Sequence, residues 1–133
     1  MKRNHLVPAL TLLAALVSSF ASSADLTTVT ARDRSWMNSS VAAGAEQASL
    51  WGDELGDQGL LLRWPSRTKL KPATLDHDVH IVVMNGTFTV EWGDQYRELG
   101  PGGYASIPRG TSHVLGCEAA GECLLLVHRL RTK

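Results

Sequence analysis

The sequence predicts an all-β domain built as a small double-sheet jelly-roll barrel. From Ser49 onward, short apolar runs alternate with turn residues at the spacing typical of β-strands. The run Val79–Met84 is largely apolar on both of its faces, which indicates a strand buried between two layers. No segment has the period of a helix longer than a few turns. About eight strands in roughly 85 residues suit a jelly roll, in which the closed arrangement protects strand edges.

The first 24 residues have the three parts of a secretory signal peptide. Met1–His5 is short and basic, Leu6–Val17 is apolar, and the small residues that follow allow cleavage after Ala24. The apolar run is well short of the roughly 20 residues that cross a bilayer, so no stable membrane anchor is expected. We therefore expect a periplasmic or secreted protein.

Removal of residues 1–24 leaves 133 − 24 = 109 residues, which is enough for one domain with one modest core. Residues 25–48 are rich in serine, threonine and alanine and are expected to form a loose N-terminal arm, with Trp36 and Met37 able to dock. Residues 49–133 are expected to form the barrel.

The mature charge is close to neutral, at 11 basic against 13 acidic residues once Lys2 and Arg3 are removed from the 13 and 13 of the whole chain. One basic group has strand spacing and is expected to share one solvated face: Arg63, Arg67, Lys69 and Lys71. A nucleic-acid partner needs a larger basic surface and is not expected. An acidic small molecule or partner is the alternative for this face.

The expected strands follow one another between turn residues. They are Leu50–Trp51, Gly59–Trp64, Thr68–Lys71, Val79–Met84, Thr87–Trp92, Tyr104–Ile107 and Cys123–Leu130. Asn85 and Gly86 separate two of these runs, and Asn-Gly tolerates the positive φ angles that both central residues of a type I′ turn require. The sequence therefore predicts a hairpin of Val79–Met84 with Thr87–Trp92.

Two cysteines remain, Cys117 and Cys123, and the five residues between them resemble a hairpin loop. Two thiols that flank a tight reversal reach bridging distance, and an exported chain passes through an oxidising compartment, so we expect a disulfide. Closing so small a loop contributes about 2 kcal/mol in the chain-entropy model. The pair alone is weak evidence for a metal site.

A motif near the end of the chain reads G-x₅-P-x-G-x-x-H, with Gly102, Pro108, Gly110 and His113 at its fixed positions. Proline and glycine at this spacing predict a tight turn between two strands, after which His113 points into the barrel. The pattern resembles the second motif of the cupin superfamily, the RmlC-like jelly rolls. Gly86 stands where the first cupin motif ends in glycine.

Similarity to small exported cupins extends from about Leu50 to His128. The resemblance implies a cupin-type double-stranded β-helix barrel and a homodimer. In the family, two histidines and a glutamate of the first motif join the second-motif histidine to hold a divalent metal such as zinc, iron or manganese. Ala73, Leu75 and Val79 occupy those first-motif positions here and offer no ligand atom. A single imidazole does not make a metal site, so we expect no metal cofactor.

A rebuilt metal site is the alternative, and it would use His77 or His80 together with His113 and His128. In a regular strand His77 and His80 point to opposite faces, so their convergence needs a bend or bulge. His128 lies on the last expected strand, where similar small cupins carry a histidine. The simpler interpretation is that these histidines are core, pocket or surface residues.

Three functions fit this sequence, and it leaves open whether the protein is an enzyme. The first is a metal-free exported cupin that binds a small organic ligand in an apolar barrel. The alternative is a metal-dependent isomerase, lyase or dioxygenase that uses atypically placed histidines. A third is metal-free acid–base catalysis by His113 with Glu91 or His128.

The tryptophans bear on the barrel interior. Trp36, Trp51, Trp64 and Trp92 could line an aromatic ligand pocket, but in so small a barrel they are expected mainly to fill the core.

Overall fold

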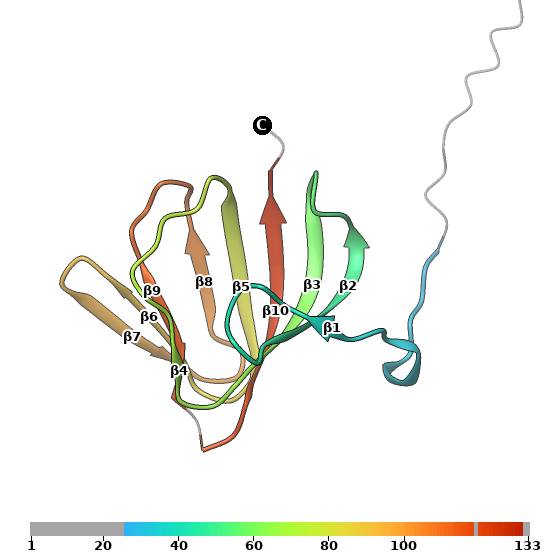
Figure 1. The fold of residues 1–133 in the computed structure, drawn as a ribbon, viewed down its shortest axis with the longest axis horizontal. Coiled ribbons are helices and arrows are strands. Elements are labelled where there is room, and N and C mark those ends of the chain that lie inside the picture. The colour runs from blue at the N-terminus through green and yellow to red at the C-terminus, as the bar shows by residue number, and fades with distance from the viewer. Residues whose placement is uncertain (1–25, 119, 132–133) are drawn as a thin grey trace, which may run out of the picture.

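The computed structural model describes residues 26–118 and 120–131, so the predicted signal peptide of residues 1–24 lies outside the described chain. The all-β prediction is confirmed, because antiparallel strands in two sheets make up the domain (Figure 1). The six-stranded sheet has the order β1(Met37–Asn38), β2(Glu46–Gly52), β3(Gln58–Trp64), β10(Cys123–Leu130), β5(Asp78–Asn85), β8(Tyr104–Ile107). The four-stranded sheet has the order β4(Thr68–Lys69), β9(Val114–Cys117), β6(Phe88–Trp92), β7(Gln95–Leu99).

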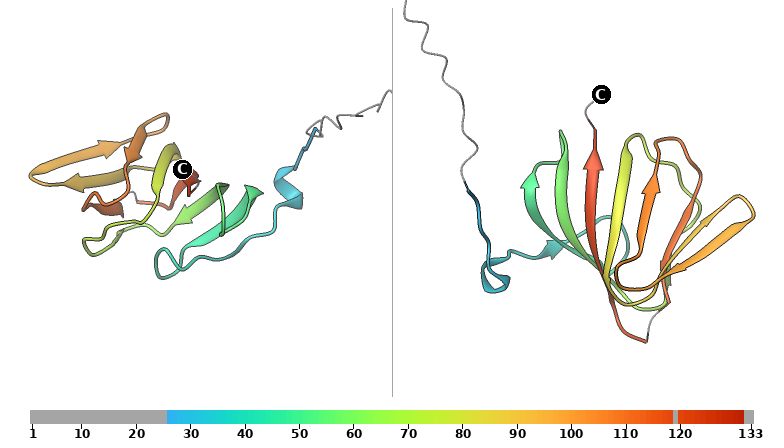
Figure 2. Two further views of the ribbon diagram at one scale, coloured as in Figure 1. Left: turned by 90° about the horizontal axis from the view of Figure 1, so that it is seen from above. Right: turned by 180° about the vertical axis from the view of Figure 1, so that it is seen from behind.

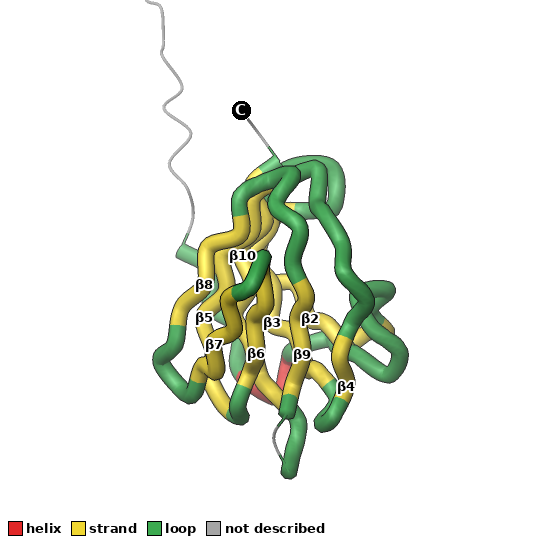
Figure 3. The backbone as a smooth tube through the Cα atoms, turned by 90° about the vertical axis from the view of Figure 1, so that its left-hand side faces the viewer, coloured by secondary structure: helices red, strands yellow, loops and turns green. Residues whose placement is uncertain are grey.

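The two sheets lie face to face, with the four-stranded sheet in front of the six-stranded sheet when the molecule is seen from the side (Figure 3). Figure 2 shows the same two layers from above and from behind. Alternate residues of the central strands point between the layers, and they form one core. Its largest fully buried side chains are Trp64, Phe88, Leu60, Leu125 and Val83. Among the described residues, no helix has the length and apolar character needed to cross a membrane.

The Asn85–Gly86 corner differs from the predicted hairpin. β5 pairs with β10 and β8, whereas β6 pairs with β7 and β9, so the chain changes sheets at this corner. Gly86 has a φ of 86°, but Asn85 does not have the positive φ that a type I′ turn requires. The hairpin prediction is therefore wrong. Gly86 serves a sheet-to-sheet corner, which needs the same local backbone freedom.

The segment between the cysteines is also a sheet crossover, although the sequence suggests a hairpin loop. Cys117 ends β9 in the four-stranded sheet and Cys123 begins β10 in the six-stranded sheet. A disulfide joins the two residues, with their Cα atoms 5.9 Å apart. Thr87 lies at the neighbouring crossover, where its carbonyl accepts a hydrogen bond from the Glu118 amide at 3.0 Å and lies 3.2 Å from the Cys123 sulfur. The disulfide therefore ties the two sheets together at the crossover from β9 to β10, which lies at the lower end in Figure 1.

The first strands begin earlier in the chain than predicted, within the segment expected to be a loose N-terminal arm. Met37 and Asn38 pair with β2, and β2 begins at Glu46 rather than at the predicted start of the barrel. Gln47 points inward and accepts a hydrogen bond from the Ser39 hydroxyl at 2.9 Å, with both side chains buried. The sequence lacks an apolar alternation here because this buried pair is polar, and the two side chains are hydrogen-bonded to each other.

β7 is a second element that the sequence did not predict. Its five residues pair with β6 around a two-residue turn at Gly93 and Asp94, and this is the hairpin that the β6 segment makes. Most of its side chains are exposed, so it carries no apolar run. Arg97 and Leu99 of β7 line a cavity between the sheets.

Candidate functional site

A cavity of about 440 Å³ opens between the sheets, which is within the size range of small-molecule sites. Its walls come from β6, β7, β8 and the segment that leads into β9: Val90, Trp92, Arg97, Leu99, Tyr104, Ala105, Ser106, Ile107, Pro108, Thr111 and His113. Most of these side chains are apolar. Trp92 and Arg97 lie at the rim, with the guanidinium carbon 6.0 Å from the centre of the tryptophan ring. The site therefore combines an apolar interior with a few polar groups.

His113 is placed in this cavity by the turn that the motif predicts. The amide of Thr111 donates to the carbonyl of Pro108 at 3.2 Å, and Gly110 has a φ of 76° that favours glycine. The Gly110 amide also donates to the carbonyl of Leu75, which fastens the turn to the segment before β5. His113 then forms a backbone bridge with Ala73. The imidazole is 6% exposed and lines the cavity.

The hydrogen bond of His113 fixes which ring nitrogen is available. Nδ1 lies 2.7 Å from the carbonyl oxygen of Thr111. A carbonyl only accepts, so Nδ1 carries the proton and Nε2 of the neutral ring holds a lone pair. The described residues make no hydrogen bond to Nε2. His113 can therefore accept a proton or a hydrogen bond from a molecule in the cavity.

His80 and His128 lie elsewhere, on the outer face of the six-stranded sheet. Val79, Ile81 and Val83 of β5 are buried in the core, so His80 between them points away from it. His128 is the direct cross-strand neighbour of His80 on β10. Among residues 26–118 and 120–131, no three histidine, cysteine, aspartate or glutamate side chains could hold one metal ion. The structure thus brings His80 and His128 together but does not join them to His113.

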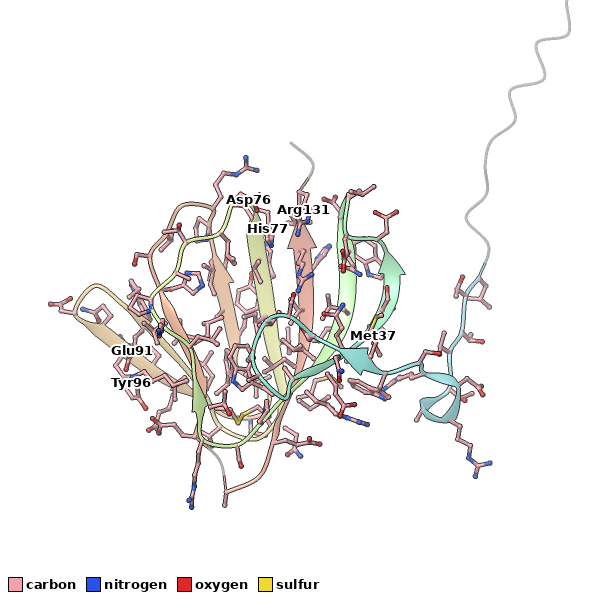
Figure 4. The ribbon with its side chains drawn as sticks, viewed as in Figure 1. Met37, Asp76, His77, Glu91, Tyr96 and Arg131 are labelled. Atoms are coloured by element: carbon pink, nitrogen blue, oxygen red, sulfur yellow. A yellow bond between two sulfur atoms is a disulfide. The ribbon has the colours of Figure 1, made fainter. Side chains whose placement is uncertain are left out.

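His77 lies at the end of the molecule opposite the disulfide, beside Asp76 and Arg131 (Figure 4). Its ring is buried, and Nδ1 lies 2.7 Å from the Asp76 carboxylate. This hydrogen bond holds the pKa of Asp76 below its ordinary value, and the positive charge of Arg131 lowers it further. Burial and the neighbouring Arg131 likewise lower the pKa of Arg129. His77 is therefore part of a polar cluster at the barrel end and does not line the cavity.

The Asp76 carboxyl should titrate below its ordinary pKa of 3.8. A depressed folded pKa means that the stabilisation is present above the unfolded pKa and is lost as the pH falls through the folded one. Carbon-detected NMR of the Asp76 carboxyl during an acid titration measures this midpoint. In His77→Asn, which removes the ring, we expect the midpoint to move upward. A wild-type midpoint at or above 3.8 would contradict the assignment.

Glu91, the other partner considered for His113, faces the opposite side of its strand. Val90 and Trp92 line the cavity, whereas Glu91 accepts a hydrogen bond from Lys69 Nζ at 2.8 Å on the outer face of the four-stranded sheet.

The basic residues predicted to share one face lie on different sheets, because Arg63 belongs to β3 and Lys69 to β4. Arg63 lies 3.7 Å from Glu46 in the six-stranded sheet, so it does not share a face with Lys69.

No protein-family model matches the sequence, and no curated protein matches it. Solved structures do. KdgF from Halomonas sp. superposes with a TM-score of 0.66 at 18% identity, over 80% of this chain and 96% of that one. An RmlC-like cupin from Shewanella frigidimarina gives 0.66 at 13% identity, over 82% and 94%. This chain has the cupin fold. The polyketide cyclase RemF from Streptomyces resistomycificus also matches, with a TM-score of 0.66, 19% identity and 81% coverage of both chains.

Ala73, Leu75 and Val79 occupy the first-motif metal positions of the cupins. Ala73 lies directly opposite His113 across a pair of backbone hydrogen bonds of 3.0 Å. Val79 is buried in the core, and Leu75 packs against it. None of these three side chains has an atom that can coordinate an ion. The residues around His113 therefore do not fit the metal that the cupin fold commonly holds.

The tryptophans divide among three environments. Only Trp64 fills the core, so the expectation that they mainly do so is wrong for the others. Trp92 lines the cavity, Trp51 is 48% exposed on the outer face, and the ring of Trp36 stacks 3.7 Å from the Arg63 guanidinium. For Trp92 the alternative interpretation, a tryptophan in a ligand pocket, describes its place in the cavity. Arg97 is a cavity residue that the sequence did not single out, because most side chains of β7 are exposed.

Proposed function

We propose that this chain is an exported cupin-fold protein that binds a small organic ligand between its sheets without a bound metal. The observation that carries the proposal is the cavity itself: about 440 Å³, mostly apolar, with one buried imidazole that has a free nitrogen. Such a combination is the usual design of a small-ligand site. Export is supported by the signal-peptide pattern of residues 1–24. The homodimer expected from the cupin resemblance stays a prediction.

The polar groups narrow the ligand class. His113 Nε2 accepts a hydrogen bond, and it can take a proton from an acid. Arg97 at the rim carries a permanent positive charge. An apolar or aromatic molecule that bears a hydroxyl or carboxyl group would satisfy both groups while its body contacts Leu99, Ala105 and Ile107.

A bulky residue at Ala105 should block the cavity. In Ala105→Trp we expect the affinity for anilinonaphthalene sulfonate, an aromatic anion whose fluorescence rises on binding, to fall by about tenfold or more. A ligand would then have to displace a packed side chain, at a cost of roughly 1–3 kcal/mol. Fluorescence titration of the folded protein measures the change.

Glu98→Trp is the matched control, because it adds the same side chain to β7 on the side away from the cavity residues Arg97 and Leu99. We expect this variant to bind the probe as the wild type does. Equal binding by wild type and Ala105→Trp would place the probe outside the cavity and count against the proposal. A near-stoichiometric metal that His113→Asn removes would also overturn it.

Proton transfer by His113 is the second candidate function. The Thr111 carbonyl fixes the ring so that Nε2 is the basic nitrogen inside a mostly apolar cavity. RemF, one of the structures with this fold, is a polyketide cyclase. Turnover of a small substrate that His113→Asn abolishes without loss of probe binding would favour this candidate over simple ligand binding.

A further inference from the structure

A histidine pair occupies the outer face of the six-stranded sheet, and neither histidine lines the cavity. His80 on β5 and His128 on β10 are direct partners in the antiparallel register. Their ring centres are 6.3 Å apart and the rings are tilted by 49°. Side chains that are opposite each other on adjacent strands point to the same side of a sheet. The two imidazoles therefore form a pair that solvent can reach.

Each ring is held by a neighbour on the same face. Nδ1 of His80 is hydrogen-bonded to the Tyr104 hydroxyl, and these two rings stack with their centres 5.8 Å apart. His128 contacts Trp51 edge to face, with ring centres 4.9 Å apart. Trp51 fits there because its neighbour on β3 is Gly59, where an added Cβ would lie 2.1 Å from the indole nitrogen. The pair is therefore positioned by an aromatic residue on either side.

We propose that His80 and His128 form a surface site for a divalent transition-metal ion, with zinc as the test ion. Imidazole nitrogens bind zinc at about 2.0–2.1 Å, and two rings bound to one ion have centres roughly 6 Å apart or less, so a small rotation of either ring suffices. The Tyr104 hydroxyl can accept the Nδ1 proton of His80, and this tautomer leaves Nε2 for the ion. Such an outer partner fixes the tautomer of a metal-binding histidine.

The surroundings suit an exchangeable ion rather than a structural one. The uncharged neighbours of the pair on this face are Gly59, Val82, Ser106, Leu126 and Leu130. The charged neighbour is Asp78, two residues before His80, whose carboxylate would attract a cation and lies 3.8 Å from the Arg109 side chain. Within the described chain, no third histidine, cysteine or carboxylate joins the pair. Water or an outside ligand must then complete the coordination, and the site stays open.

Calorimetric titration of the protein with zinc, purified without a histidine tag, tests the site. We expect one ion per chain. His80→Asn and His128→Asn should each weaken binding by about a hundredfold or more, and Tyr104→Phe by about tenfold, since an outer partner contributes less than a ligand. His113→Asn and His77→Asn are the matched controls and should bind zinc as the wild type does.

NMR of the wild-type protein gives a readout that needs no variant. On addition of zinc, the imidazole signals of His80 and His128 should shift together, while those of His77 and His113 stay in place. Failure of the wild type to bind zinc would overturn the proposal, and so would binding that survives both pair substitutions. Loss of zinc in His113→Asn alone would place the ion in the cavity, which contradicts both this site and the proposed metal-free function.

Discussion

Replacing Trp64 with alanine is expected to lower the free energy of unfolding by about 4 kcal/mol, the largest effect of any substitution considered, because deletion of a buried aromatic side chain leaves a large void. Trp64 is 1% exposed and lies between the sheets, where its ring contacts Phe88 edge to face with centres 5.3 Å apart. Its indole nitrogen also donates to the carbonyl of Thr68 at 2.9 Å, across the crossover from β3 to β4. Denaturant unfolding with the disulfide intact measures the loss.

Two further variants separate packing from hydrogen bonding. Trp64→Phe keeps most of the apolar contact and loses the bond to Thr68, so we expect a loss of about 1–2 kcal/mol. Trp92→Ala makes the same deletion at the 38% exposed rim and should cost less, because no buried void forms. A Trp64→Ala protein as stable as Trp92→Ala would mean that Trp64 does not hold the sheets together.

The strands with apolar sequences could be predicted because apolar side chains at alternate positions indicate a buried face. Val79–Met84 falls within β5, and its alternate residues Val79, Ile81 and Val83 are buried as a strand period of two requires. The outer face of this strand is only partly buried, although its sequence predicts burial on both faces. Leu126 and Tyr104, on the strands that flank β5, are likewise exposed.

Sheet membership was not predictable from local sequence. Asn85 and Gly86 have the same preferences whether the chain turns back on itself or passes to the other sheet. The pairing partner of β5 is determined by β10, which comes much later in the chain and occupies the place beside β5 that a β6 hairpin would take. The predicted hairpin loop between the cysteines failed for the same reason. In both cases the sequence correctly predicted a local change of chain direction, but the strands that it predicted to pair belong to different sheets.

The candidate site was predicted in part. The proline-glycine motif placed His113 at the cavity because its turn depends on adjacent residues. Trp92 was named only as the alternative to a core tryptophan, and Arg97 was missed because it lies on β7, whose sequence has no apolar alternation. The sequence could compare the directions of histidines only within one strand, as it did for His77 and His80, because the pairing between strands was not known. That His80 faces His128, rather than His113, follows from the register of β5 with β10.

Gly86→Ala is expected to lower the free energy of unfolding by roughly 3 kcal/mol. A residue with a side chain at a φ of 86° costs about 1–2 kcal/mol by itself. An added Cβ would also lie 2.9 Å from the carbonyl oxygen of Glu122 and 3.0 Å from both the Cα and the sulfur of Cys123. Those atoms belong to the backbone and to the disulfide that joins the sheets, so they cannot move aside cheaply.

Comparison with Gly102→Ala separates the steric part of the Gly86→Ala effect from the conformational part. Gly102 has the same φ of 86°, but an added Cβ there would meet nothing within 4 Å. It should therefore lose only the conformational part, about 1–2 kcal/mol, in the same denaturant experiment. The difference between the two losses in unfolding free energy measures how tightly the β5–β6 corner packs against the crossover from β9 to β10, which ends at Cys123. Equal losses would show that the two crossovers move independently, and the disulfide would then fasten only its own loop rather than the closed end of the barrel.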